Sequence, residues 1–154
     1  MNNRTSPKAL QIIKASEGYK LKAYLCPAGI PTIGYGHTKT VTLTDVKRGK
    51  TITQSEAERL LSVDLAELEE GVAKLVKVPI SDDQYGALVA FAFNLGLSAL
   101  STSTLLKRIN SKASMAEIGK AWVQWDKARV NGVLKPLRGL TIRRQVEFDL
   151  FHSR

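Results

Sequence analysis

Residues 17–38, EGYKLKAYLCPAGIPTIGYGHT, decide the fold of this chain. They begin with Glu17 and Gly18 and continue with LKAYL, in which apolar and polar residues alternate as they do in a half-buried strand. The CPAG of residues 26–29 has the composition of a turn, and IPTIGYGHT then resumes an extended pattern rich in Thr and Ile. This stretch predicts a β-hairpin.

A helix is predicted immediately before the hairpin. Ser6 can cap its first turn, and Pro7 suits the first helical position. Leu10, Ile13 and Glu17 then follow at the spacing of one helix face. The carboxyl of Glu17 therefore closes an apolar face at the point where the chain enters the hairpin.

A long helix is predicted after the hairpin. Residues 37–52 are polar and Thr-rich with an apolar residue at every second or third position, which predicts a third short strand and a loop. Thr53 and Glu56 form a capping box, and helical periodicity then runs to Val78-Pro79. A helix of this length is suited to connect two lobes.

The rest of the chain is predicted to be helical. Ser81 and Gln84 form a second capping box before residues 85–95, which are apolar all round as in a buried helix. Further helices are predicted over residues 103–110, 114–127 and 140–151. The expected fold is a single α+β domain over residues 1–154. A small antiparallel sheet lobe at about 18–52 is joined by the long helix to a larger helical lobe at about 79–154. The N-terminal helix also belongs to the helical lobe.

Charge indicates a polyanionic partner. The chain has 23 Lys and Arg against 14 Asp and Glu, and the two ends are basic while residues 51–100 are acidic. Nucleic acid and anionic cell-envelope polymers both fit such a surface. The single Cys26 cannot form an intramolecular disulfide, and no Cys/His cluster suggests a metal. The N-terminal MNNRTSPK lacks the apolar stretch of a secretory signal.

Glu17 is the strongest candidate for chemistry, because no other acidic residue occurs before Asp45. A carboxyl on the apolar face of a helix end is desolvated, so it can hold a proton near neutral pH and act as a general acid. The alternative is a solvated carboxylate paired with Lys14 or Lys20. From the residues alone, Cys26 also fits a small buried side chain without a catalytic role. Thr32 likewise fits an ordinary strand residue.

The order of these residues resembles the active-site segment of phage lysozymes. Cys26 lies nine residues after Glu17, Thr32 follows six residues later, and IGYGHT occupies positions 33–38. The similarity continues through FAFNLG at 91–96, STLL at 103–106 and GLTIRR at 139–144, so it covers essentially the whole chain. The resemblance implies a lysozyme-like fold and membership of the subgroup with a Glu-Cys-Thr active site.

The activity implied by the resemblance is that of an endolysin. Such an enzyme hydrolyses the β-1,4 bond between N-acetylmuramic acid and N-acetylglucosamine in peptidoglycan, which lyses the host cell. By this resemblance the catalytic residues are Glu17, Cys26 and Thr32, with Glu17 protonating the leaving oxygen. Cys26 stands where many relatives have Asp. It either orients the attacking water with Thr32 or acts as a nucleophile in its thiolate form.

Substrate contacts are also expected, at Tyr35, His37, Phe93, Asn94 and Thr104. Trp122 and Trp125 are expected to anchor the helical core rather than to stack on sugars. No metal or cofactor is implied. The resemblance further implies a monomer that accumulates in the host cytoplasm, is released by a holin and acts on peptidoglycan in the periplasm.

Two other functions remain open from the sequence. A non-catalytic peptidoglycan-binding module of the same fold is favoured only by the substitution at position 26. A nucleic-acid-binding protein is favoured by the charge, but Arg143-Arg144 and the lysines of the hairpin supply no recognition element.

Overall fold

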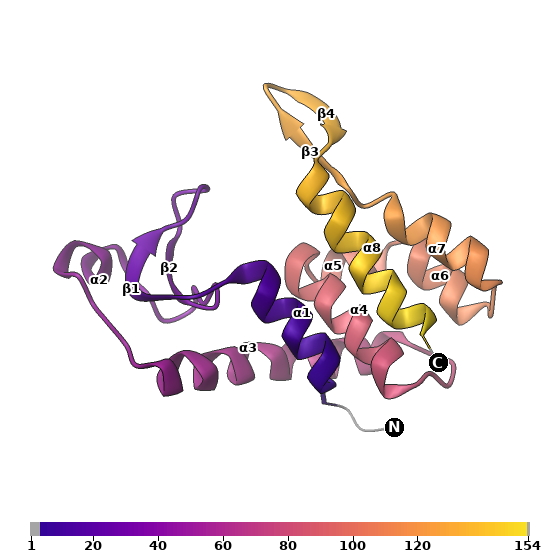
Figure 1. The fold of residues 1–154 in the computed structure, drawn as a ribbon, viewed down its shortest axis with the longest axis horizontal. Helices are drawn as coiled ribbons and strands as arrows, with labels where there is room; N and C mark the ends of the chain where they lie inside the picture. The colour runs from indigo at the N-terminus through magenta and orange to yellow at the C-terminus, as the bar shows by residue number, and fades with distance from the viewer. Residues whose placement is uncertain (1–3, 154) are drawn as a thin grey trace. The chain divides into compact units, whose positions relative to one another are not determined.

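The computed structural model describes residues 4–153, which form eight helices and two two-stranded antiparallel sheets (Figure 1). The predicted α+β class is confirmed. Residues 1–3 and 154 of the domain expected over 1–154 lie outside the described residues. The chain divides into two compact units, Lys14–Glu67, called here the sheet unit, and Met1–Ile13 with Leu68–Arg154, called the helical unit.

The predicted first helix and hairpin are confirmed. Helix α1 spans Pro7–Glu17, and the backbone N–H of Ala9 donates to the Ser6 hydroxyl oxygen at 3.3 Å in its first turn. Gly18 ends the helix with a left-handed φ of 61°, which glycine adopts without a steric penalty. Strands β1, Lys20–Leu25, and β2, Pro31–Gly34, then pair antiparallel.

The predicted third strand is wrong, because residues 43–48 form a short helix instead. Helix α2, Leu43–Arg48, begins with a capping box in which Asp45 N–H donates to the Thr42 hydroxyl and Thr42 N–H donates to the Asp45 carboxylate. Gly49 ends it in the left-handed conformation. The extended pairings recorded for residues 37–52 are two isolated bridges, Lys22 with Thr51 and Ile33 with His37.

A small hydrophobic core holds the sheet unit together. It joins the hairpin, α2 and the first turns of α3, Gln54–Leu75, and consists of Ala23, Ile33, Val41 and Leu60 with the partly buried Val46 and Ile52. The Thr53 hydroxyl accepts the N–H of Glu56 at 3.1 Å, as the sequence predicted for the start of the long helix. The hairpin therefore rests on the same core as the beginning of α3.

Helix α4, Asp82–Leu95, is the buried centre of the helical unit. Its Ser81–Gln84 capping box is present as predicted, and every residue from Tyr85 to Ala92 is buried. The surrounding helices are α5, Leu97–Ser101, α6, Thr104–Asn110, α7, Met115–Val123, and α8, Arg138–His152. Among residues 4–153, none of the helices combines the length and apolar character needed to span a membrane.

Gly86 and Gly119 are two of the glycines that let helices of this unit approach closely. A Cβ placed on Gly86 of α4 would lie 2.6 Å from the Cβ of Ala9. One placed on Gly119 of α7 would lie 2.6 Å from the ring of Phe148 on α8. Both distances are shorter than packed carbon atoms allow, so the helix contacts depend on the absent side chains.

A second hairpin was not predicted from the sequence. Helix α7 ends at Val123 instead of continuing to about residue 127, and strands β3, Lys127–Val130, and β4, Val133–Pro136, follow. Asn131 and Gly132 connect the strands with φ values of 52° and 78°. Two consecutive left-handed residues are typical of the two-residue turn that Asn-Gly favours.

A buried cluster of charges links three helices of the helical unit. Arg144 and Glu147 of α8 are both fully buried, and Arg143 Nε lies 3.2 Å from Glu147 Oε2. Arg144 Nη2 donates to Glu147 Oε2 at 3.0 Å and to Asn94 Oδ1 at 2.7 Å, while Trp122 Nε1 donates to Glu147 Oε1 at 3.1 Å. Burial raises the pKa of Glu147, and the two arginines oppose that rise.

We expect Arg144→Met to lower the free energy of unfolding by about 3–5 kcal/mol, because it removes the fully buried partner of the Glu147 carboxylate and leaves Arg143 as its remaining arginine. Arg138→Met is the matched control: Arg138 lies at the start of the same helix but is exposed, so its effect should stay within about 0.5 kcal/mol. Urea unfolding followed by circular dichroism measures both. Equal effects of the two substitutions would contradict the role assigned to Arg144.

Candidate functional site

Glu17 occupies the last position of α1, against the backbone of the hairpin. A Cβ placed on Gly36 would lie 3.5 Å from Glu17 Oε2, and Gly36 has a left-handed φ of 74°. The expectation that the helix face desolvates Glu17 is wrong, since the residue is exposed where the helix ends. Of the two lysines considered as its partners, Lys14 pairs with Glu58 and Lys20 lies over the Tyr24 ring.

Cys26 and Thr32 are brought together by the turn between β1 and β2. The Cys26 N–H donates to Ile30 O at 3.0 Å, and the Thr32 hydroxyl donates to the same carbonyl oxygen at 2.8 Å. Tyr24 pairs with Thr32 across the strands. Because side chains alternate along a strand, Tyr24, Cys26 and Thr32 share one face of the hairpin.

The charges of this face interact. Hydrogen bonding with the Ile30 backbone lowers the pKa of the Cys26 thiol, and the Ala28 backbone and the Thr32 hydroxyl add to this effect while burial opposes it. Burial raises the pKa of Tyr24, and the negative charges of Cys26 and Glu17 raise it further. The acid, the thiol and the phenol thus lie in one electrostatic environment.

Tyr24 was not among the residues expected at the site. Its position two residues before Cys26 in an alternating strand was the pattern that could have identified it. The structure adds it to the face formed by Cys26 and Thr32.

His37 lies in a buried network beside this face. Its side chain is 2% exposed, Nδ1 lies 2.9 Å from Asp64 Oδ2, and Nε2 lies 2.7 Å from the Thr40 hydroxyl. The Thr40 N–H also donates to Nε2, so we assign the ring proton to Nδ1, facing Asp64. Both ring nitrogens are thus engaged within the protein, and the substrate contact expected of His37 stays a prediction.

Tyr35 is buried in a second network. Its hydroxyl donates to Glu58 Oε1 at 3.2 Å and accepts a hydrogen bond from Gln54 at 3.0 Å. The Lys14 ammonium lies 2.6 Å from the Glu58 carboxylate and lowers its pKa. Since Lys14 precedes Glu17 by one helical turn, this network fixes the end of α1, and the substrate contact expected of Tyr35 stays a prediction.

The other three expected residues belong to the helical unit. Phe93 and Asn94 are half-buried at the end of α4, and Thr104 is exposed at the start of α6. Arg144 donates to the Asn94 amide oxygen, which leaves the Asn94 NH₂ group as a donor. The sequence alone could not show that a buried arginine fixes this amide.

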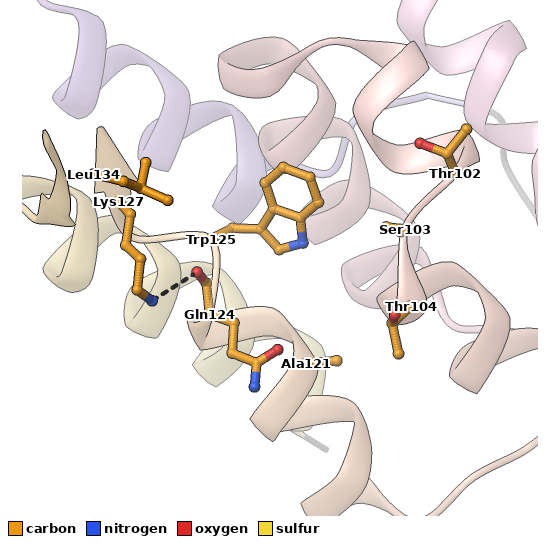
Figure 2. A pocket seen from close by; sticks show the side chains of 8 residues that line it. All are labelled: Thr102, Ser103, Thr104, Ala121, Gln124, Trp125, Lys127 and Leu134. Atoms are coloured by element: carbon orange, nitrogen blue, oxygen red, sulfur yellow. Dashed lines mark hydrogen bonds between the residues drawn. The ribbon is translucent and has the colours of Figure 1, made fainter. Parts of the chain in front are cut away.

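Thr104 lines a cavity of about 430 Å³ in the helical unit (Figure 2). Its walls are formed by Thr102, Ser103, Thr104, Ala121, Gln124, Trp125, Lys127 and Leu134. In Figure 2 the Trp125 indole lies between the hairpin residues Lys127 and Leu134 on one side and the segment of residues 102–104 on the other. A cavity with hydroxyls, an amide and an indole can hold a polar ligand with apolar faces.

The two tryptophans differ in their environments. Trp122 is fully buried, as expected for a core residue, and packs against the rings of Phe91, Phe148 and Phe151. Trp125 contacts the Phe91 ring, as expected for a residue that anchors the helical core, and it also borders the cavity. Within residues 4–153 no group of three or more His, Cys, Asp or Glu side chains is placed to hold a metal.

Comparison with known proteins identifies the family. Residues 14–147 match the phage lysozyme family model. The endolysin of Acyrthosiphon pisum secondary endosymbiont phage 1 is 43% identical over 148 residues, which cover 96% of this chain and 97% of that protein. The endolysin of Salmonella phage P22 is 42% identical over 123 residues, covering 80% of this chain and 84% of that protein.

A solved structure gives the same result for the fold. The muramidase domain of SpmX from Asticaccaulis excentricus superposes with a TM-score of 0.89 at 34% identity, covering 99% of this chain and 100% of that one. The lysozyme-like fold expected from the sequence is therefore confirmed. The chain belongs to the phage lysozyme family.

Proposed function

We propose that this chain is an endolysin that hydrolyses the β-1,4 bond between N-acetylmuramic acid and N-acetylglucosamine in peptidoglycan. The observation that carries the proposal is the convergence of three groups on the first hairpin. The Glu17 carboxylate lies against Gly36, and the turn brings the Cys26 thiol beside the Thr32 hydroxyl. Glycoside hydrolysis needs one acid to protonate the leaving oxygen and a second group to position the attacking water. Glu17 supplies the acid, and Cys26 with Thr32 supplies the water-binding pair.

Glu17 is the general acid in this proposal. Its proton passes to O4 of N-acetylglucosamine while the bond from that oxygen to C1 of N-acetylmuramic acid breaks. Because Glu17 is exposed in the free protein, the bound sugar must supply the surface that excludes water from the carboxyl. The Gly36 backbone below it allows the sugar to approach closely, since no side chain stands there.

Cys26 and Thr32 hold and deprotonate the attacking water. The Thr32 hydroxyl oxygen can accept a hydrogen from water whether its own hydrogen is donated to Ile30 O or to the Cys26 thiolate. The water oxygen forms the new bond to C1, and its second proton passes to the Cys26 thiolate. A thiol of lowered pKa supports this role of Cys26 as the base, and attack by water from the face opposite the leaving group inverts the anomeric carbon.

The helical unit binds further parts of the polymer. The Asn94 NH₂ group is a donor for the carbonyl oxygens that N-acetyl groups and stem peptides carry. The cavity beside Thr104 offers hydroxyls, the Gln124 amide and the Trp125 indole. We assign this unit to binding and the first hairpin to bond cleavage.

The proposed setting follows from the family. The protein acts as a monomer, accumulates in the host cytoplasm and reaches the peptidoglycan after a holin opens the inner membrane. Its basic ends favour approach to the anionic envelope. A non-catalytic peptidoglycan-binding module is the second candidate, favoured only by Cys26 at a position where many relatives have Asp.

Substituting Glu17→Gln should lower the rate at which outer-membrane-permeabilised Gram-negative cells are cleared by about 10²-fold or more, because glutamine cannot donate the proton. Glu67→Gln is the matched control, since Glu67 is an exposed α3 residue paired with Lys39, and it should clear cells as fast as the wild type. Turbidity and mass spectrometry of the released fragments measure both. If the wild type binds purified sacculi without cleaving them, the binding-module candidate replaces the enzyme.

Substituting Cys26→Asp should keep activity and move its pH dependence toward acid. In the wild type kcat/KM rises with pH as the thiolate forms, whereas an aspartate of ordinary pKa about 3.9 is ionised throughout the neutral range. Cys26→Ser, which cannot ionise, should lose activity across the range. The pH profiles of the three proteins test this, and a Ser variant as active as the wild type would show that Cys26 only fills space.

Substituting Thr104→Val should raise KM about 2- to 10-fold and leave kcat unchanged, because it removes one hydrogen bond of about 0.5–1.5 kcal/mol to bound polymer. Thr44→Val on α2 is the matched control, an exposed threonine outside the cavity. Steady-state kinetics on solubilised glycan strands separate the two constants. A KM that is equal in both variants would remove Thr104 from the binding surface.

A further inference from the structure

The second hairpin has an unusual distribution of apolar side chains. Its apolar tip, defined as residues 130–134, contains three aliphatic residues and the uncharged Asn-Gly turn. Val133 is 61% exposed and Leu134 is 56% exposed, the two largest exposed fractions among the large hydrophobic residues of the described chain. Figure 1 shows the hairpin extending past the N-terminal end of α8.

Exposing these aliphatic side chains to water does not stabilise the hairpin. A two-stranded hairpin is marginal by itself and normally gains stability by burying one face. Here all four residues of β4 are exposed, and the Val130–Val133 pair stands next to the turn, at the far end from the helices. The tip therefore presents aliphatic surface that some other surface would cover favourably.

The charges behind the tip are of one sign. Between residues 127 and 138 the sequence KARVNGVLKPLR has four basic residues and no acidic one. Arg129, Lys135 and Arg138 are all exposed, and they form what we call the basic collar of the tip. Lys127, the fourth basic residue, and Leu134 of the tip both line the cavity already assigned to the polymer.

We propose that this hairpin docks on a lipid bilayer containing anionic headgroups, with the apolar tip entering the interface and the basic collar contacting the headgroups. An apolar end backed by cations is the chemistry of interfacial membrane binding, in which buried apolar area and attraction to anionic lipids add together. An anionic glycan or a nucleic acid bound by the collar would leave Val133 at the end of the tip in water. The function goes beyond bond cleavage, because it concerns the membrane surface beside the wall.

Vesicle sedimentation with the full chain tests the proposal. The protein should bind vesicles of phosphatidylcholine mixed with phosphatidylglycerol, and bind vesicles of phosphatidylcholine alone far more weakly. Arg129→Gln with Lys135→Gln should weaken binding about 25-fold, corresponding to about 1 kcal/mol for each cation. Val133→Ser should weaken it roughly 3- to 10-fold, because it removes aliphatic surface from the interface.

Matched variants in the sheet unit are the controls. Val63→Ser changes a 49% exposed valine of α3, and Lys47→Gln with Arg48→Gln removes two cations from α2. Neither should alter vesicle binding if the hairpin is the docking surface. Equal losses in hairpin and control variants, or equal binding to both kinds of vesicle, would overturn the proposal.

A further measurement separates lipid from glycan. The vesicles contain no peptidoglycan, so their result is independent of the proposed hydrolysis, and Glu17→Gln should bind them as the wild type does. Binding of the hairpin variants to purified sacculi is measured in parallel. If Val133→Ser weakens binding to sacculi and leaves vesicle binding unchanged, the hairpin serves the wall polymer and the lipid proposal fails.

Discussion

The helical unit depends on a single buried carboxylate. Glu147 is fully enclosed, and its oxygens are occupied by arginines of its own helix and by the indole N–H of Trp122. Because a buried charge without partners is costly, α7 and α8 can pack only in the arrangement that brings these donors to it. Arg144 extends the same constraint to α4 by taking the Asn94 amide oxygen. Electrostatics inside the core thus sets the orientation of a side chain assigned to polymer binding.

The sheet unit is organised by its backbone rather than by buried charge. Gly18 and Gly36 adopt left-handed conformations that let the helix end and the hairpin approach each other. The Ile30 carbonyl then accepts hydrogen bonds from both Cys26 and Thr32, which fixes the spacing of the two side chains. The proposed chemistry follows from this turn, because hydrogen bonding of the thiol with the Ile30 backbone also holds the pKa of Cys26 below its usual range.

Sequence periodicity predicted the long elements of this fold but not its short ones. The α1 helix, the first hairpin, the start of α3 and the buried α4 follow from capping residues and apolar spacing that no tertiary contact overrides. At α2 the apolar spacing suggested a strand. The Thr42–Asp45 capping box instead stabilises the start of a helix. The Asn131-Gly132 pair is a typical hairpin turn and could have predicted the second hairpin. Helical periodicity predicted only the helices on either side of it. Position in sequence also could not show that Tyr35 and His37 are buried, since burial is a property of the packed unit.

The close helix contacts at Gly86 and Gly119 have a consequence for engineering this protein. Replacing glycine by alanine inside helices is a common way to raise thermostability, because it restricts the unfolded chain and improves helix propensity. At these two positions the added methyl group would meet Ala9 or the Phe148 ring at 2.6 Å, so the overpacked core would offset the gain. A more heat-resistant form must therefore be sought on the surface and in the loops, where extra atoms have room.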